Sequence, residues 1–406
     1  MAEQALAIYL DEMLVGTLHG DSNDRHEFRL DRAYRERYPR PILGQVFEDD
    51  PDRIHKSSIQ LPPWFSNLLP EGALREMVAR QVGVKEIREF YLLARVGCDL
   101  AGAVRAVPLG ELKQQATIST VAEGDDPEVR FSLAGLQLKL SMIRDGQRWI
   151  LPVRDQSGHW LVKLPDPSFP RVPENEYSML SWSAAVGIET PDHELVEMTH
   201  IDVPKGVQRS ERLALAVRRF DRQPDGTRVH QEDFAQVFGL YSHKKYDRYN
   251  YESIASVLLR TAGREALDSF IDRLVFVIAS GNGDAHHKNW SLRYPDGMIA
   301  SLSPTYDQVA TVLYPGLDHS LALNLGGSKR FEDIRMRAFT RLAKRLDLDP
   351  TAMEAKVRDA VTRICDAWNT VADDTPLTSG DRDAVERHWR RVPLLSQPVS
   401  SFVRSA

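Results

Sequence analysis

The order of hydrophobic patterns along the chain is the feature that most limits its fold. Short alternating apolar runs at Ala5–Leu10 and Met13–Leu18 predict a β-hairpin at the start. Short strands are predicted again between Phe131 and Leu164, and long helical patterns dominate after about residue 250. A β-rich region followed by a mainly helical region is typical of a two-lobed α+β protein with a cleft between its lobes.

Glycine and proline residues mark where the predicted helices begin and end. We expect one helix between Pro70 and Gly83 and another from about Glu86 to Arg95, because each apolar face ends near a glycine. Further helices are predicted at residues 174–186, 251–261, 265–280, 331–346 and 351–372, and strands at 160–164, 193–198 and 213–218. We therefore divide the chain into an N-terminal subdomain (1–110), a β-rich lobe (111–225) and a helical lobe (226–406).

The net charge argues against one broad class of function. Lys and Arg number 52 and Asp and Glu 58, so a formal charge of −6 does not suit a chain held mainly by phosphate backbones or anionic membranes. Cys98 and Cys365 lie far apart without metal-ligand spacing, which argues against disulfides and structural zinc. With no signal peptide and no run of ~18 apolar residues, we expect a cytoplasmic protein without a membrane partner.

The stretch from Gly281 to Trp290 is the strongest candidate for a chemical site, because its glycines predict a tight loop directly after an apolar helix. Four residues separate Asp284 from Asn289, the spacing at which protein-kinase catalytic loops present a carboxylate to a substrate hydroxyl and an amide oxygen to Mg²⁺. Asp307 follows a predicted β-hairpin, where a second metal-binding carboxylate is expected. The alternative is that these residues only stabilise turns, with the neighbouring histidines as surface polar groups.

A phosphotransferase also needs a cation for the ATP phosphates, and Lys163 is the candidate. It ends an apolar strand, where a buried ammonium group is costly without an anionic partner. Glu176, at the start of the next predicted helix, is a candidate to hold it. The alternative is a strand-edge lysine and a glutamate favoured by the helix dipole. Neither a P-loop nor a standard kinase glycine loop occurs, and the stretch Phe131–Leu140 is the only substitute.

These motifs together give the chain a family resemblance. It resembles the HipA family of bacterial toxin kinases, the toxin halves of HipA–HipB type II toxin–antitoxin pairs. The residues that carry the resemblance run along nearly the whole chain: Asn67–Gly72, Gly97–Ala103, Ser132–Leu140, Trp160–Leu164, Glu174–Tyr177, Arg219–Arg222, Gln231–Asp233, Asn282–Asn289 and Tyr306–Asp307. So many matches in the same order are hard to obtain by chance.

The resemblance implies a kinase-like fold with a residue for each catalytic role. Asp284 would be the catalytic base, and Asn289 and Asp307 the Mg²⁺ ligands. Lys163 would contact the ATP phosphates, and Arg218–Phe220 would form the hinge beside adenine. The full nucleotide-binding set that the matched motifs imply is Ala134, Gly135, Lys163, Arg218, Arg219, Phe220, Gln231 and Lys288.

The resemblance also implies a site of self-modification, since Ser132 matches the serine that the family autophosphorylates. Around it, Leu136 and Leu138 replace the Ala and Glu of the family's A-G-A-Q-E-K pattern. The motif thus keeps Ala134, Gly135, Gln137 and Lys139 of that pattern.

The implied biology is that of a toxin. The family's core kinases phosphorylate a serine on an aminoacyl-tRNA synthetase, which stops translation and growth. The implied partners are a HipB-like helix-turn-helix antitoxin, a protein substrate such as an aminoacyl-tRNA synthetase, and operator DNA reached mainly through the antitoxin. Two alternatives stay open: a kinase that acts on a small molecule or lipid, and a non-catalytic co-repressor.

Two further features have simpler explanations. The predicted helix 331–346 carries the basic residues Arg335, Arg337, Arg341, Lys344 and Arg345, which are spread around it and favour a solvated face. The alternative is a contact with DNA phosphates or with an antitoxin. Trp64, Trp182 and Trp368 are most simply core residues.

Overall fold

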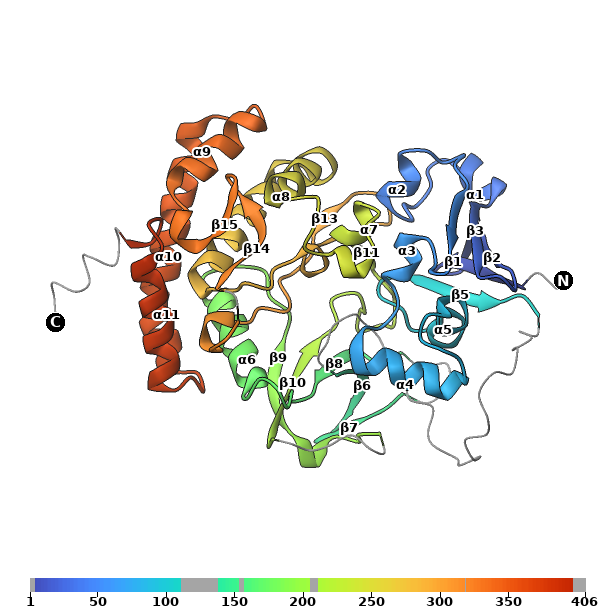
Figure 1. Cartoon of the computed structure of the whole chain (residues 1–406), viewed down its shortest axis with the longest axis horizontal. Coiled ribbons are helices and arrows are strands. Elements are labelled where there is room, and N and C mark those ends of the chain that lie inside the picture. Colours follow the sequence, from blue (N-terminus) through green and yellow to red (C-terminus); the bar gives the residue numbers. More distant parts are fainter. Residues whose placement is uncertain (1–3, 111–137, 153–156, 205–210, 318, 397–406) are drawn as a thin grey trace. The chain divides into compact units, whose positions relative to one another are not determined.

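The structure is a computed structural model, and it describes residues 4–110, 138–152, 157–204, 211–317 and 319–396 (Figure 1). The chain divides into two compact units. Unit 1 comprises Met1–Asp166, Val196–His243 and Leu292–Ile299, and unit 2 comprises Pro167–Leu195, Lys244–Ser291 and Ala300–Ala406. The predicted division at residues 110 and 225 is a different way of dividing the chain and stays a prediction.

Unit 1 contains two antiparallel sheets joined by short helices. The first sheet has the order β4-β3-β2-β1-β5 and is built from β1 (Gln4–Leu10), β2 (Met13–Gly20), β3 (Arg25–Leu30), β4 (His55–Ser58) and β5 (Val104–Pro108). The second has the order β7-β6-β8-β10-β9 and is built from β6 (Lys139–Asp145), β7 (Arg148–Ile150), β8 (Trp160–Lys163), β9 (His193–Glu197) and β10 (Leu213–Arg218). The boundary between the units falls within β9.

Short helices complete unit 1: α1 (Arg32–Glu36), α2 (Gln45–Glu48), α3 (Pro63–Ser66), α4 (Gly72–Val82), α5 (Glu89–Val96) and α7 (Phe234–Val237), together with β11 (His230–Asp233) and the 3-10 turns Met198–His200 and Ser242–Lys244. One hydrophobic core includes residues from both sheets. In β3, buried Phe28 alternates with polar neighbours, as a strand with one covered face requires. Its ring packs on Phe47 and Phe65, with centroids 5.3 and 4.6 Å away.

Unit 2 is mainly helical, and its helices are α6 (Val172–Ala185), α8 (Tyr251–Ser280), α9 (Met336–Arg345), α10 (Pro350–Asp373) and α11 (Ser379–Arg391). Its short strands and turns are β13 (Ser301–Leu302), β14 (Ser320–Leu325), β15 (Ser328–Arg330) and the 3-10 turns His287–Asn289, Thr311–Leu313 and Phe331–Asp333, while β12 (Ser291–Tyr294) leads the chain back into unit 1. Among the described residues, no helix is long and apolar enough to cross a membrane.

Aromatic rings form the centre of unit 2. Trp182 of α6 packs on Phe276 of α8 at 4.9 Å and on Trp368 of α10 at 4.5 Å, and Trp389 of α11 lies 5.9 Å from Trp368. Two of these indole nitrogens have backbone partners: Trp182 Nε1 donates to Ile364 O at 3.1 Å, and Trp389 Nε1 donates to Ala279 O at 2.7 Å. The prediction of Trp182 and Trp368 as core residues is therefore confirmed, as it is for Trp64 in unit 1.

The predicted α+β class is confirmed, and the differences from the predicted elements are local. The helices predicted at 251–261 and 265–280 are both present and are numbered together as α8, but Gly263 between them has non-helical backbone angles (φ 79°, ψ −170°). The basic helix starts at Met336 rather than at Phe331, because residues 331–333 form a 3-10 turn. Its basic residues are exposed and Phe339 and Leu342 are buried, and the choice between a solvated face and a contact with DNA or an antitoxin stays a prediction. Helix α11 was not predicted.

Candidate active site

The loop after α8 is fixed by its first three residues. Gly281 ends the helix in the left-handed region (φ 65°), and a Cβ there would lie 2.6 Å from the Val312 side chain, so the position requires glycine. Asn282 is fully buried, and its Oδ1 accepts a hydrogen bond from the Asp284 amide at 2.9 Å. Gly283 N donates to Thr311 Oγ1 at 2.8 Å. The loop is thus attached to the segment that follows Asp307.

Asp284 and Asn289 are brought together as their spacing predicts. Asn289 Nδ2 donates to the Asp284 carbonyl oxygen at 2.8 Å, so the two residues close the loop on itself. Because the amide nitrogen is used in this way, Oδ1 is the Asn289 atom suited to hold a cation. The Asp284 side chain is 53 % exposed, which leaves its carboxylate accessible to an acceptor.

Asp307 lies in a backbone conformation that few residues adopt. Its φ is 51°, in the left-handed region where Asp is tolerated better than most residues with a Cβ. A non-glycine residue held in this region is frequent at functional sites, where the surrounding structure fixes a side-chain direction. The conformation is consistent with the predicted role of Asp307 as a metal ligand.

Arg273 of α8 connects the segments that carry Asn289 and Asp307. It is fully buried, and its Nη2 donates to Asn289 O at 2.7 Å while Nη1 donates to Ser303 O at 3.3 Å and Pro304 O at 3.4 Å. Burial lowers the pKa of Arg273 to about 10, which keeps it protonated at neutral pH. One guanidinium therefore sets the spacing between the two segments.

The donor atoms at this site fit Mg²⁺. Asn289 offers an amide oxygen and Asp307 a carboxylate, and Mg²⁺ prefers hard oxygen ligands, of which protein groups supply only some while phosphates and waters supply the others. Among the described residues, no group of three or more His, Cys, Asp or Glu side chains could hold a metal by itself. A cation at this site would therefore bind together with a phosphate-bearing ligand.

The two histidines of the loop are buried rather than on the surface. His287 is inaccessible, its Nδ1 lies 2.6 Å from Lys245 O, and burial lowers its pKa to about 4, so it is neutral at physiological pH. His286 is 5 % exposed. Lys288, predicted to bind nucleotide, is 7 % exposed beside them. The histidines are thus part of the framework of the loop.

Lys163 lies in the middle of the second sheet of unit 1. It is 2 % exposed and directly opposite Lys139 of β6, which is 5 % exposed. Like charges at opposed positions of neighbouring strands repel, and burial adds to that cost. Lys163 is thus a buried cation in this sheet, and its predicted contact with the ATP phosphates stays a prediction. Glu176 is buried in α6 of unit 2, and its predicted pairing with Lys163 stays a prediction.

The predicted hinge residue Arg219 has its guanidinium in a buried ion-pair network. It donates to Asp99 Oδ1 at 2.9 Å and to both oxygens of Asp221 at 3.0 and 2.9 Å. Arg222 binds the same two carboxylates. Burial alone would raise the pKa of Asp221, but Arg219 and Arg222 outweigh it and lower the pKa to about 2. The Arg219 side chain is thus structural, so any contact of Arg219 with adenine would come from its backbone. The predicted adenine contacts of Arg218 and Phe220 stay predictions.

Residues Gln231–Asp233 are also largely structural. Glu232 is fully buried and accepts from Tyr294 OH at 2.7 Å, Gln45 N at 2.9 Å and Trp64 Nε1 at 3.0 Å. Burial raises the pKa of Glu232 to about 7. Asp233 caps α7. Gln231 is 7 % exposed, and its predicted contact with nucleotide stays a prediction.

The predicted phosphate loop cannot be placed, because Ser132, Ala134 and Gly135 lie outside the described residues. Two residues that matter at the site were not predicted from the sequence. Arg273 could have been found, since it is a charge inside the apolar run of α8. Tyr246, whose hydroxyl donates to Asp284 Oδ1 at 2.5 Å, has no comparable signal.

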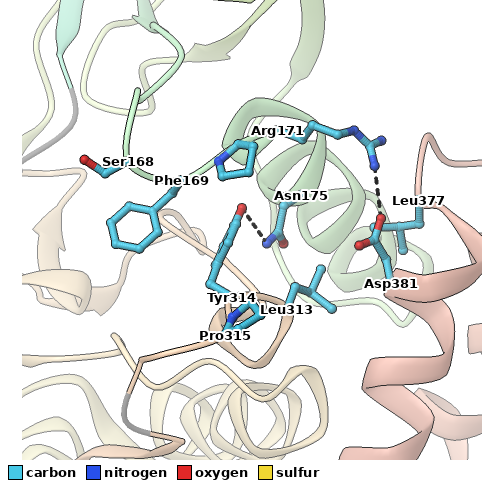
Figure 2. A pocket seen from close by; sticks show the side chains of 10 residues that line it. Ser168, Phe169, Arg171, Asn175, Leu313, Tyr314, Pro315, Leu377 and Asp381 are labelled. Atoms are coloured by element: carbon cyan, nitrogen blue, oxygen red, sulfur yellow. Dashed lines mark hydrogen bonds and ion pairs between the residues drawn. The ribbon is translucent and has the colours of Figure 1, made fainter.

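Unit 2 also contains a pocket of about 290 Å³ (Figure 2). Arg171 donates to Asp381 at 3.1 Å on one side of it, and Asn175 donates to Tyr314 OH at 3.2 Å on the other. Asn175 also holds both backbone groups of Ala310. None of the residues lining the pocket is a predicted site residue, and the Asn175 bonds attach α6 to the segment after Asp307.

Comparison with known proteins shows the family. Residues 131–368 match the HipA-like C-terminal domain and residues 6–107 the HipA N-terminal domain. The Sinorhizobium fredii protein Y4dM is 36% identical over 94% of this chain and 95% of its own length. The serine/threonine-protein kinase toxin HipA of Shewanella oneidensis is 26% identical over 66% of this chain and 67% of its own length.

A solved structure shares the fold. The Shewanella oneidensis complex of HipA, HipB and operator DNA contains a chain that matches with a TM-score of 0.75 and 20% identity, covering 98% of this chain and 97% of that one. The predicted resemblance, fold class and enzyme class are therefore confirmed, and this chain belongs to the HipA family of kinases.

Proposed function

We propose that this protein is a Mg²⁺-dependent serine/threonine-protein kinase and the toxin of a type II toxin–antitoxin pair. The observation that carries the proposal is the loop in which Asn289 Nδ2 binds the Asp284 carbonyl, with Arg273 attaching that loop to the segment before Asp307. Membership of a kinase family implies that the phosphoryl donor is ATP. The spacing and the attachments together suit a base and two metal ligands.

In this proposal each group has a separate task. Asp284 accepts the proton of the acceptor hydroxyl, and the oxygens of Asn289 and Asp307 hold Mg²⁺ against the phosphates. Lys163, with Lys139 beside it in the sheet, neutralises phosphate charge. These electrostatic contributions matter because the transferred group gains little covalent help from the protein.

The proposed partner is a HipB-like helix-turn-helix antitoxin. The Shewanella oneidensis HipA structure holds HipB and operator DNA. Because this chain carries a net charge of −6, most phosphate contacts of an equivalent complex would come from the antitoxin. A HipB-like helix-turn-helix protein should be sought in the neighbouring reading frame. Gel filtration of this chain with that protein should show co-elution at micromolar concentration, and separate elution would contradict the partnership.

The kinase proposal is tested with labelled ATP in a cell lysate. The parent should label a protein, such as an aminoacyl-tRNA synthetase, and Asp284→Ala should lower the rate about 10²- to 10⁴-fold while nucleotide still binds, because a base acts in the transition state. Asp307→Asn should instead weaken Mg²⁺-ATP binding in calorimetry. Label that enters only a metabolite or lipid would favour the small-molecule kinase. No transfer by the parent, with antitoxin binding retained, would favour the co-repressor.

Self-modification at Ser132 is a separate part of the proposal. A phosphate there adds about −1.5 to −2 charges, which would compete with ATP for Lys163 and lower nucleotide affinity. Mass spectrometry after incubation with Mg²⁺-ATP should find one phosphate on Ser132 that is absent from Asp284→Ala. A Ser132→Asp variant that binds ATP as tightly as Ser132→Ala would contradict the switch.

A further inference from the structure

A tyrosine contacts the carboxylate that the proposed reaction uses as its base. The Tyr246 hydroxyl donates to Asp284 Oδ1 at 2.5 Å, a short hydrogen bond of the strength expected when the acceptor is ionised. The Tyr246 ring stands edge-on to His286, with centroids 5.0 Å apart. His286 Nε2 in turn lies 3.9 Å from the same Oδ1. Two side chains therefore flank one oxygen of Asp284.

The backbone around Tyr246 is attached on both sides. The preceding carbonyl, Lys245 O, receives the His287 amide at 3.2 Å and lies 2.6 Å from His287 Nδ1. The carbonyl of Tyr246 itself accepts from Lys329 Nζ of β15 at 3.3 Å. The ring is 40 % exposed, so burial does not hold it in place. These attachments to the loop and to β15 direct the hydroxyl at Asp284.

A carboxylate that rotates freely presents its oxygens to the acceptor in many directions, and only some lead to transfer. One held oxygen removes that freedom, because χ2 of an aspartate is otherwise broad. The second oxygen, Oδ2, is then presented in a single direction. This matters most in a reaction whose catalysis depends on positioning.

We propose that Tyr246 is a positioning residue for Asp284: its hydroxyl fixes Oδ1 so that Oδ2 receives the serine or threonine hydroxyl of the acceptor. The inference rests on the proposed kinase function and deepens it. It makes Tyr246 a support of the base rather than a group that the acceptor must displace, since a carboxylate has room for hydrogen bonds at both oxygens.

The test is Tyr246→Phe, which removes one oxygen and keeps the ring on His286. With Mg²⁺-ATP and the acceptor protein identified by labelling, kcat should fall about tenfold, equivalent to ~1.4 kcal/mol, while KM for ATP stays within about twofold of the parent. The matched control is Tyr249→Phe, the same chemical change three residues away on a ring that packs on His287 at 6.4 Å. That variant should keep the parent's kcat.

A double-mutant cycle separates positioning from general support of the loop. In an Asp284→Ala background no carboxylate remains to be positioned, so adding Tyr246→Phe should leave the residual rate unchanged. The inference is overturned if Tyr246→Phe lowers the rate equally in both backgrounds, or if its kcat equals or exceeds the parent's. It is also overturned if Tyr249→Phe loses as much kcat as Tyr246→Phe. If the parent transfers no phosphate, the proposed function fails and this inference falls with it. Parental activity with a normal Asp284→Ala defect but an unaffected Tyr246→Phe refutes the inference alone.

Discussion

Replacing Asp99 by Asn should strongly destabilise unit 1, because this carboxylate is at the centre of the buried ion-pair network. It accepts from Ser141 Oγ at 2.8 Å, Ser157 Oγ at 2.5 Å, Arg219 Nη1 at 2.9 Å and Arg222 Nη2 at 2.8 Å. Asp99 is 2 % exposed, so water cannot replace these bonds. Asparagine keeps the shape but removes the charge and turns an NH₂ group toward groups that donate.

The size of the effect follows from the charges that remain. Two guanidinium groups, each with a side chain 1 % exposed, would share the single carboxylate of Asp221. Breaking a buried pair by removing one partner costs about 3–5 kcal/mol. Domains unfold with only about 5–15 kcal/mol, so the change removes a large part of the stability of unit 1.

Hydrogen exchange followed by mass spectrometry measures the loss of stability caused by Asp99→Asn in each unit separately. Amides of β6, β8 and β10 should lose protection by about 10²- to 10³-fold in Asp99→Asn, since each factor of ten corresponds to ~1.4 kcal/mol. Amides of α8 and α10 in unit 2 should keep theirs. The matched control is Asp225→Asn, in the exposed turn after the network, which should cost less than about 0.5 kcal/mol.

The pH dependence gives the same prediction a second check. The guanidinium groups outweigh burial and hold the pKa of Asp99 and Asp221 below the ordinary value of 3.8. Both carboxylates therefore stabilise the folded state above pH 3.8, and this contribution is lost as the pH falls toward 2. The difference in unfolding free energy between the parent and Asp99→Asn should therefore become smaller as the pH falls over that range. A cost under about 1 kcal/mol at pH 7, or equal changes in both units, would refute the reasoning.

Three further changes are expected to have distinct outcomes. Burial raises the pKa of Glu232 from 4.5 to about 7, so the folded state binds the proton more tightly than the unfolded state does, and the stability falls as the pH rises through this range. The loss amounts to roughly 2–4 kcal/mol of unfolding free energy, and thermal unfolding at several pH values should show that Glu232→Gln abolishes it. Gly281→Ala should lower kinase activity at least about tenfold, because the added Cβ would displace the loop against Val312. The control is Gly187→Ala, at a position where φ is 80° and nothing lies within 4 Å of the added Cβ. This variant should lose only about 1 kcal/mol of stability in urea unfolding and keep its activity. Arg273→Lys keeps the charge but cannot bridge two segments, so titration should show a several-fold higher KM for Mg²⁺.

The helix boundaries show which sequence signals can be trusted. Gly83 ends α4 in the left-handed region as predicted, with φ 73°. Gly97 also follows a helix end, but its φ is −60° and a Cβ would lie 2.2 Å from Ala106 O, so close packing rather than helix capping requires glycine there. Gly263, with a non-helical φ of 79° and ψ of −170°, separates the two helices that are numbered together as α8, as the two predicted ranges require. Helix α11 was missed because few of its residues are apolar, and its buried side chains include Val385 and Trp389.

The site was predictable only where its contacts are local in sequence. The bond between Asn289 and the Asp284 carbonyl joins residues five apart, so their spacing alone predicts it. The Tyr246 contact with Asp284 joins residues 38 apart, and the Arg219 contact with Asp99 joins residues 120 apart. The resemblance predicts that Arg219 lies in the hinge beside adenine, and this stays a prediction, but the sequence does not show which carboxylates its guanidinium binds. Whether a charged side chain serves the reaction or stabilises the fold depends on its burial and on partners that are far away in the sequence.

The network also explains why the N-terminal HipA region and the second sheet form one unit. Asp99 of the N-terminal region accepts a hydrogen bond from Arg219. Gly102 N donates to Asp221 Oδ2 at 2.8 Å, and Gly102 O accepts from Arg222 at 2.9 Å. Trp64 and Gln45 hold Glu232 in the same way. Arg219, one of the three residues proposed to lie beside adenine, thus depends on Asp99 and Leu100 of the N-terminal region for part of its hydrogen bonding. A change in the N-terminal region that alters these bonds would therefore reach the proposed hinge without touching ATP.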